Sequence, residues 1–187
     1  MPYLIILLVI ILFWVVGAYN SLTKLKVRSE EAWSDIDVQL KRRYDLIPNL
    51  IETVKGYAKH EKKVFTDVTA ARSAAIGAKS IKSQQEAENM LTSALKSVFA
   101  VAENYPKLEA SANFVKLQEE LSDTENKIEA ARRFYNANVR DLNTKIQIFP
   151  SNLIANMFNF TQKELFEIEE VTQREAPKVK FEEWKQF

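Results

Sequence analysis

The chain has 187 residues, with 26 Lys and Arg against 25 Asp and Glu, no Cys, three Gly and five Pro. Without cysteine it cannot form disulfides, thiolate nucleophiles or Cys-type zinc sites. The balanced charge lacks the net basicity of a nucleic-acid binder, so no nucleic-acid partner is expected. So few Gly and Pro argue against an all-β fold, which needs frequent turns. The composition therefore predicts long helices.

The N-terminus carries an uncharged apolar run, YLIILLVIILFWVVGAY, at residues 3–19. Its length is at the short end of what crosses a hydrocarbon core of ~30 Å, and Trp14 and Tyr19 suit the headgroup region. Two alternatives are a cleaved signal peptide, for which Val16-Gly17-Ala18 offers small residues, and a buried soluble helix. We favour a transmembrane anchor because no Lys or Arg precedes the run and no polar face interrupts it.

Basic residues follow the apolar run and none precedes it. Lys24, Lys26 and Arg28 come directly after it. Since Lys and Arg stay preferentially on the cytoplasmic side, we expect the N-terminus outside and the bulk of the chain in the cytoplasm.

The rest of the chain shows helical periodicity between prolines. Apolar residues recur with heptad spacing, and Pro48 and Pro106 suit the first turn of a helix. We predict helices at 20–45, 48–76, 83–104 and 107–147, the first continuing from the anchor without a break. Short connections make neighbouring helices antiparallel. The predicted fold is all-α: a single N-terminal transmembrane helix (1–19), then an antiparallel four-helix bundle of long helices (20–160) and a charged tail (161–187).

Two connections of this bundle share the membrane-distal pole and carry polar residues. Guanidinium groups beside carboxylates can bind an acidic partner. The alternative, which we favour, is structural: the same groups pair across turns and cap helices, with Asp45 as an N-cap. The candidate partner-binding residues are Arg42, Arg43, Asp45, Asn49, Glu103 and Asn104.

The segment 146–160, IQIFPSNLIANMFNF, has no charge and should return to the bilayer. One hypothesis is that it lies at the membrane interface or presents a contact surface for a membrane partner. The alternative, which we favour, is that its side chains fill the base of the bundle. The candidate membrane-interface residues are Phe149, Leu153, Ile154, Met157 and Phe158.

The sequence shows no catalytic, metal or cofactor motif. His60 is the single histidine, and Val64 stands where a zincin would need its second one. A di-iron bundle would need paired Glu-x-x-His motifs. Glu61, Thr124 and Asn138 interrupt the apolar seams, and we interpret them as polar positions that fix helix register. We therefore expect no enzymatic activity and no cofactor.

Four segments carry a family resemblance. WSDIDVQLKRRYDLIPNLIETVKGYAKHE (33–61), FAVAENYPKLEA (99–110), TENKIEAARRFYNANVRDLN (124–143) and FPSNLIA (149–155) closely resemble the LemA family of bacterial membrane proteins. The resemblance covers about residues 19–160. It implies a single-pass helical bundle of the bacterial cytoplasmic membrane with no established enzymatic activity.

The functional expectation is a scaffold or adaptor that organises or regulates envelope proteins. The alternative is a self-associating, membrane-shaping or lipid-interacting structural protein. The expected partners are the lipid bilayer, other membrane or envelope proteins, and further copies of the chain.

Overall fold

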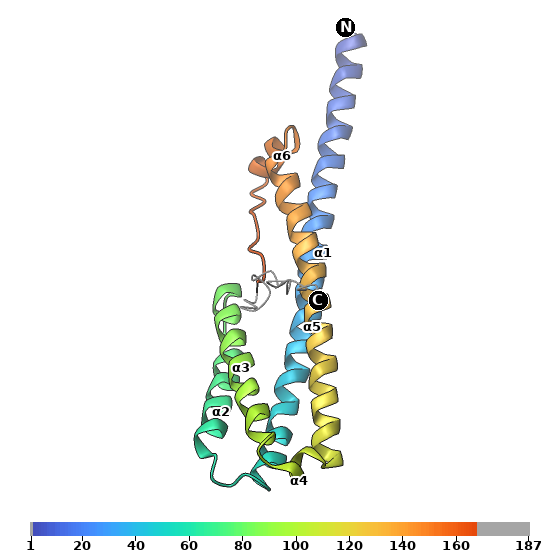
Figure 1. Cartoon of the computed structure of the whole chain (residues 1–187). Helices are drawn as coiled ribbons and strands as arrows, with labels where there is room; N and C mark the ends of the chain where they lie inside the picture. Colours follow the sequence, from blue (N-terminus) through green and yellow to red (C-terminus); the bar gives the residue numbers. More distant parts are fainter. Residues whose placement is uncertain (1, 168–187) are drawn as a thin grey trace, which may run out of the picture.

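The computed structural model describes residues 2–167, and every regular element in that range is a helix (Figure 1). The helices are α1 (Pro2–Lys55), α2 (Lys62–Ile76), α3 (Ile81–Ala102), α4 (Pro106–Glu109), α5 (Ala112–Gln147) and α6 (Ser151–Met157). The predicted all-α class and the long apolar N-terminal helix are confirmed. Of the predicted tail 161–187, residues 168–187 lie outside the described range.

Helix α1 is one uninterrupted helix of 54 residues, about 80 Å long at ~1.5 Å per residue. As expected, the apolar run passes into the rest of α1 without a break. Its most apolar 18-residue window has a mean hydropathy of 2.5 and is only 6% buried. The run is therefore long and apolar enough to cross a membrane, and it is not the core helix of the folded body.

The prediction that Pro48 begins a second helix is wrong, because α1 continues through it to Lys55. A proline inside a helix has no N–H for the carbonyl four residues earlier, which here belongs to Tyr44. That carbonyl instead accepts a hydrogen bond from Nε of Arg72 on α2, at 2.8 Å. A tertiary hydrogen bond thus replaces the helical one that Pro48 removes.

The chain reverses at residues 56–61, so the predicted helix 48–76 is divided between the end of α1 and α2. Gly56, a poor helix former, follows the last residue of α1. The Ala58 N–H then donates to Val54 O at 2.9 Å and closes the final turn, and the Ala58 side chain is fully buried. Glu61 occupies the N-cap position of α2 and not a helical seam.

Helices α3 and α5 lie close to their predicted ranges, 83–104 and 107–147. Ser80 and Ser83 form a capping box at the start of α3, in which each side chain accepts from the other's backbone N–H, at 3.1 and 3.0 Å. Pro106 begins the one-turn helix α4, and α5 starts after Ser111.

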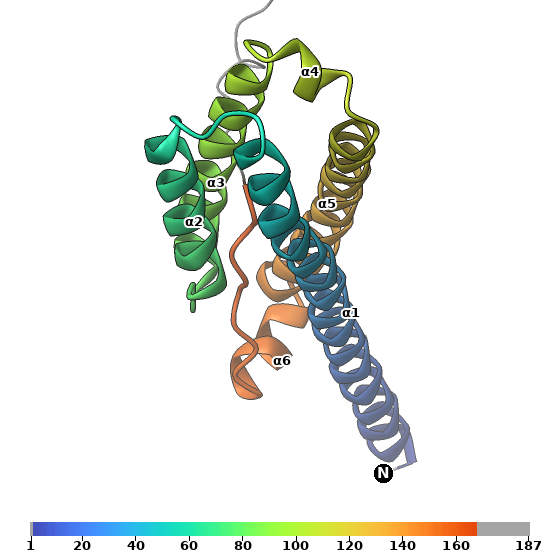
Figure 2. The same cartoon turned by 90° about the horizontal axis from the view of Figure 1, so that it is seen from below.

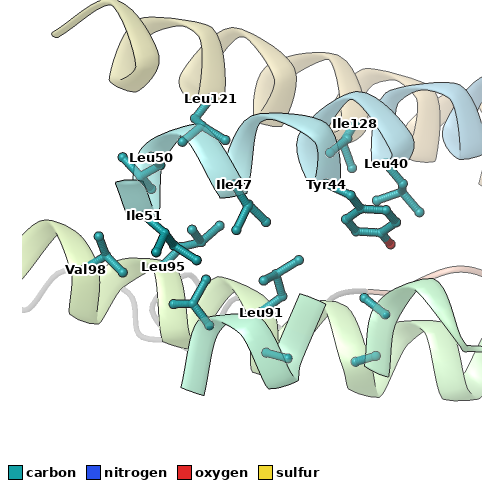
Figure 3. Packing of buried hydrophobic residues seen from close by; sticks show 14 of the residues in the cluster. Leu40, Tyr44, Ile47, Leu50, Ile51, Leu91, Leu95, Val98, Leu121 and Ile128 are labelled. Carbon is teal, nitrogen blue, oxygen red and sulfur yellow. The ribbon is translucent and has the colours of Figure 1, made fainter. Parts of the chain in front are cut away.

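The long helices pack mainly as two pairs, α1 with α5 and α2 with α3. Figures 1 and 2 show both pairs running side by side, and their apolar residues share one core. The predicted regular four-helix bundle is not confirmed, because α1 lies between α5 and the α2–α3 pair (Figure 3). Residues drawn there from α1 are Leu40, Tyr44, Ile47, Leu50 and Ile51, those from α5 are Leu121 and Ile128, and those from α3 are Leu91, Leu95 and Val98.

A second, smaller core joins α6 to α1 and α5. Its buried members are Leu22, Leu142, Ile146, Ile154 and Ala155. Beyond α6, Asn159 adopts a positive φ of 55°, which Asn tolerates better than most residues. Phe160 N then donates to Ala155 O at 2.9 Å, a helix-ending turn that sends the chain back along the body.

Candidate functional site

Helix α6 lies beside α1 (Figure 1), and it carries exposed apolar side chains. Phe149, Leu153, Met157 and Phe158 are 78%, 54%, 69% and 48% exposed, whereas Ile154 is 3% exposed and belongs to the second core. Four of the five candidate interface residues therefore face outward, and Ile154 fills the base of the body.

Aromatic contacts fix the position of α6 along α1. The Tyr19 ring lies edge-on to Phe158 and Phe160, with centroid distances of 4.8 and 5.7 Å. Since Tyr19 ends the apolar run, the outward face of α6 lies level with the point where a membrane-crossing α1 would leave the hydrocarbon.

After α6 the chain forms an extended segment, residues 160–167, which we call the strap. It returns between α1 and the α2–α3 pair (Figure 2). Asn143 on α5 binds both backbone groups of Lys163, its Nδ2 donating to Lys163 O at 2.9 Å and its Oδ1 accepting from Lys163 N at 2.9 Å. Asn136 binds Phe166 in the same way, at 3.0 and 2.8 Å.

The spacing of these two contacts has a simple geometric basis. Seven helical residues rise ~10.5 Å, and three extended residues span ~10 Å. The distance between Asn136 and Asn143 along α5 therefore matches the distance between Phe166 and Lys163 along the strap. Both asparagines bind backbone groups of the strap and not its side chains. Residues 161–167, which the sequence analysis assigned to a tail, therefore pack on the helices.

The side chain that anchors the strap is Phe166, which is fully buried. Its ring packs edge-on against Trp33 of α1, with a centroid distance of 5.3 Å, and Trp33 also packs against Tyr135 at 5.3 Å. The Tyr135 hydroxyl donates to Glu164 O at 2.9 Å. Burial, followed by the charge of Glu164, raises the pKa of Tyr135 to about 12, so it remains a donor.

A buried polar network links α1, α3 and α5 deeper in the body. Arg43 is 3% exposed and Glu88 fully buried. Arg43 Nη1 lies 3.3 Å from Glu88 Oε2 and 3.0 Å from Glu125 Oε2, and its Nη2 donates to Thr92 Oγ1 at 2.9 Å. The Tyr44 hydroxyl donates to Glu88 Oε1.

The network shifts the pKa values of Glu88 and Tyr44. Burial raises the pKa of Glu88, while the hydrogen bond from Tyr44 and the charge of Arg43 act in the opposite direction. Burial and the neighbouring Glu88 raise the pKa of Tyr44. Gln84 Nε2 completes the set by donating to Tyr44 Oη at 2.8 Å and to Glu88 Oε1 at 3.0 Å.

The predicted partner-binding cluster is not gathered at one pole, since no turn occurs at 42–45. Arg43 is in the buried network, and Asp45 lies inside α1 and so is not an N-cap. An exposed stripe on α1 consists of Arg42, Asp45 and Asn49. Arg42 Nη2 lies 4.0 Å from Asp123 Oδ2 on α5. Glu103 and Asn104 are exposed after the end of α3. Whether these residues bind a partner stays a prediction.

The polar residues of the predicted seams bond mostly within their own helix. Thr124 Oγ1 donates to Glu120 O at 2.7 Å, and Asn138 Nδ2 donates to Phe134 O at 2.9 Å. By contrast, the side chains of Glu88, Asn136 and Asn143 bond to other elements. Sequence reasoning did not single out Asn143, although two asparagines seven positions apart in a helix share a face.

A cavity of about 670 Å³ lies between α1, the α2–α3 connection and the strap, and its lining includes Trp33, Asp37, Lys79, Gln84 and Glu164. Within residues 2–167 no group of three or more His, Asp and Glu could hold a metal ion. The arrangement offers clefts and charged surfaces for binding.

The fold and these surfaces define an α-helical protein whose N-terminal helix can cross a membrane and whose body is closed by an asparagine-held strap. Residues 32–181 match the LemA family, and the chain belongs to that family. Protein LemA of Metamycoplasma hominis is 27% identical over 160 residues, which cover 85% of this chain and 73% of that relative. The resemblance inferred from the sequence is confirmed.

Proposed function

We propose that this chain is a membrane-tethered scaffold or adaptor that organises or regulates envelope proteins. The supporting observation is the continuity of α1, a single helix from the apolar run to the core residue Val54. In this proposal residues 3–19 span the bacterial cytoplasmic membrane. The long helices then act as one antiparallel four-helix unit on the cytoplasmic side, where Lys24, Lys26 and Arg28 favour placing it.

The proposal assigns no catalysis to the chain. The ionisable groups buried in the network, Arg43, Tyr44 and Glu88, are engaged with one another and with neighbouring side chains. Such satisfied networks rigidify a body and specify one packing. A rigid body on a continuous helix is suited to holding partners at a fixed height above the bilayer.

The exposed stripe Arg42, Asp45 and Asn49 is the partner surface that we propose on α1. A photocrosslinking residue placed at Asp45 or Asn49 in the full chain, irradiated in intact bacterial membranes, should give a crosslinked product of defined stoichiometry. The matched control is Thr66, exposed on α2. If all three positions give the same concentration-dependent self-crosslinks and no distinct partner, the scaffold proposal is wrong.

A second candidate function, lipid interaction or membrane shaping, is favoured by the exposed apolar face of α6. Concentration-dependent self-association with deformation of liposomes by the purified full chain would support it over the scaffold. A defined heterologous partner with undeformed liposomes would support the scaffold.

A further inference from the structure

A small cavity lies beside α6, at the level where α1 leaves its apolar run. Its volume is about 240 Å³. It is enclosed by α1, α5 and the chain that follows α6. The lining residues are Tyr19, Thr23, Lys26, Leu142, Phe158, Asn159, Phe160, Thr161 and Lys163.

The lining of this cavity combines aromatic and cationic residues. Its aromatic residues form one cluster, in which Tyr19 packs against Phe158 and Phe160. The lining also contains two lysines, Lys26 and Lys163, together with hydroxyl and amide side chains. No carboxylate is among the described lining residues, although Glu30 pairs with Lys163 Nζ from outside at 3.2 Å.

The cavity also lies at a specific depth if α1 crosses the membrane. Thr23 and Lys26 follow Tyr19 by four and seven residues, about 6 and 10 Å along the helix axis. The interfacial layer of a bilayer extends roughly 5–7 Å beyond the hydrocarbon on each side, and a lysine side chain can reach back toward it. The Lys26 side chain can therefore reach the layer that holds lipid phosphates.

We propose that this cavity binds the phosphate group of an anionic phospholipid, with Lys26 and Lys163 at the phosphate and the Tyr19 aromatic cluster against the apolar part of the lipid. Phosphate is the shared chemistry of a lipid headgroup and a free anion, and the aromatic cluster and the depth favour the lipid. The site requires that α1 crosses the membrane, but it requires no protein partner. Failure of the lipid-binding test would therefore leave the scaffold proposal standing, and failure of the scaffold proposal would leave the lipid site standing.

The first test measures retained lipid by native mass spectrometry, with the full chain in neutral detergent titrated with phosphatidylglycerol or phosphatidylcholine. Phosphatidylglycerol should bind more tightly, and Lys26→Gln should weaken its binding about fivefold, the effect of one lysine near a lipid surface. Lys24→Gln is the matched control, because Lys24 is exposed at a similar depth and does not line the cavity. Equal losses in both variants, or no preference for phosphatidylglycerol, would overturn the proposal.

A second variant separates the cavity from diffuse charge attraction. Thr161→Trp fills the cavity from an exposed position and leaves both lysines in place, so it should also abolish the preference for phosphatidylglycerol; Thr161→Leu replaces it if the tryptophan variant fails to fold. Retained preference in a folded filling variant would contradict a cavity site. Inorganic phosphate, added at the same concentration as the lipid, should not displace it, and displacement would mean that the site takes the free anion.

Discussion

The backbone carbonyl of Tyr44 on α1 accepts a hydrogen bond from Nε of Arg72 on α2, at 2.8 Å. In a regular α-helix the N–H of residue 48 would bond that carbonyl, but Pro48 has no N–H. Tyr44 also donates its hydroxyl to the buried Glu88. One residue thus joins α1 to α2 by its backbone and to α3 by its side chain.

This relationship predicts non-additive mutations at Arg72 and Pro48. Arg72→Met should lower the unfolding free energy by ~1–3 kcal/mol, the cost of leaving a buried carbonyl without a donor. In a Pro48→Ala background the helix supplies that donor, and Arg72→Met should cost clearly less. Urea unfolding of the full chain in neutral detergent measures both. Arg133→Met is the control, since Arg133 is exposed and pairs with Glu129 of its own helix; equal costs of Arg72→Met in both backgrounds would contradict the explanation.

The strap should depend on the amide of Asn136. Asn136→Asp removes the donor to Phe166 O and places a carboxylate against that carbonyl, so we expect a loss of ~1–3 kcal/mol in unfolding free energy. Hydrogen exchange at the Phe166 amide should accelerate markedly. Asn126→Asp makes the same chemical change at an exposed position of α5 and should leave that exchange rate unchanged. Slow exchange in Asn136→Asp would mean that the donor to Phe166 O does not hold the strap, since the variant keeps an acceptor for Phe166 N.

The buried and exposed arginines should differ sharply in their contribution to stability. Arg43→Met leaves Glu88 without its buried counter-charge and should cost ~3–5 kcal/mol. Arg42→Met removes an exposed pair with an N–O distance of 4.0 Å and should cost under ~1 kcal/mol. Thermal unfolding compares the two variants, and crosslinking in membranes tests partner capture. If Arg43→Met loses partner capture while keeping wild-type stability, its predicted structural role is wrong.

Stability should depend on pH through Glu88 in a defined direction. Its pKa is raised from an ordinary value of 4.5 in the folded protein, so between that value and the raised one the folded state holds a proton that the unfolded state releases. Its contribution is full below about 4.5 and is lost as the pH rises from there through the raised folded pKa. Glu88→Gln should remove this loss. Unfolding titrations between pH 4 and 8 check it; a wild-type profile identical in slope to that of Glu88→Gln would refute it.

Asp123 supplies a control of opposite sign for the pH series. The hydrogen bond from Lys127 lowers the pKa of Asp123 from 3.8. Its contribution is therefore present above that value and is lost as the pH falls through the lowered pKa. Asp123→Asn should flatten the acid side of the profile and leave its slope above about pH 5 unchanged.

The outward face of α6 should contact lipid. Because the chain contains no cysteine, single cysteines at Leu153 and Met157 can carry nitroxide labels in the full chain, reconstituted in bilayers. Power-saturation measurements should show high collision rates with oxygen and low rates with a water-soluble nickel complex. A label at Val115, exposed near the start of α5, should show the reverse. Equal nickel access at all three positions would remove the membrane-interface assignment.

The helix assignments differ in how far local sequence could predict them. The predicted ranges 83–104 and 107–147 lie close to α3 and α5, because an apolar seam is a local signal. Pro106, however, begins the separate one-turn helix α4. The end of α1 was misplaced at Pro48, because the residue that compensates the proline, Arg72, lies on another helix. Likewise, the burial of Arg43 follows from Glu88 and Thr92 across the core, and sequence spacing alone suggested a turn at that position.

The amino-acid sequence alone determined the helical class, the apolar run of residues 3–19 and the absence of cysteine chemistry, because composition and periodicity are properties of neighbouring residues. Only the tertiary structure decided where α1 ends, which of the polar residues are buried, and that residues 160–167 return along α5. The strap has no periodicity of its own, and its position depends on the side chains of Asn136 and Asn143, which lie 30 and 20 residues away in the chain. Contacts of that range are set by how the helices pack.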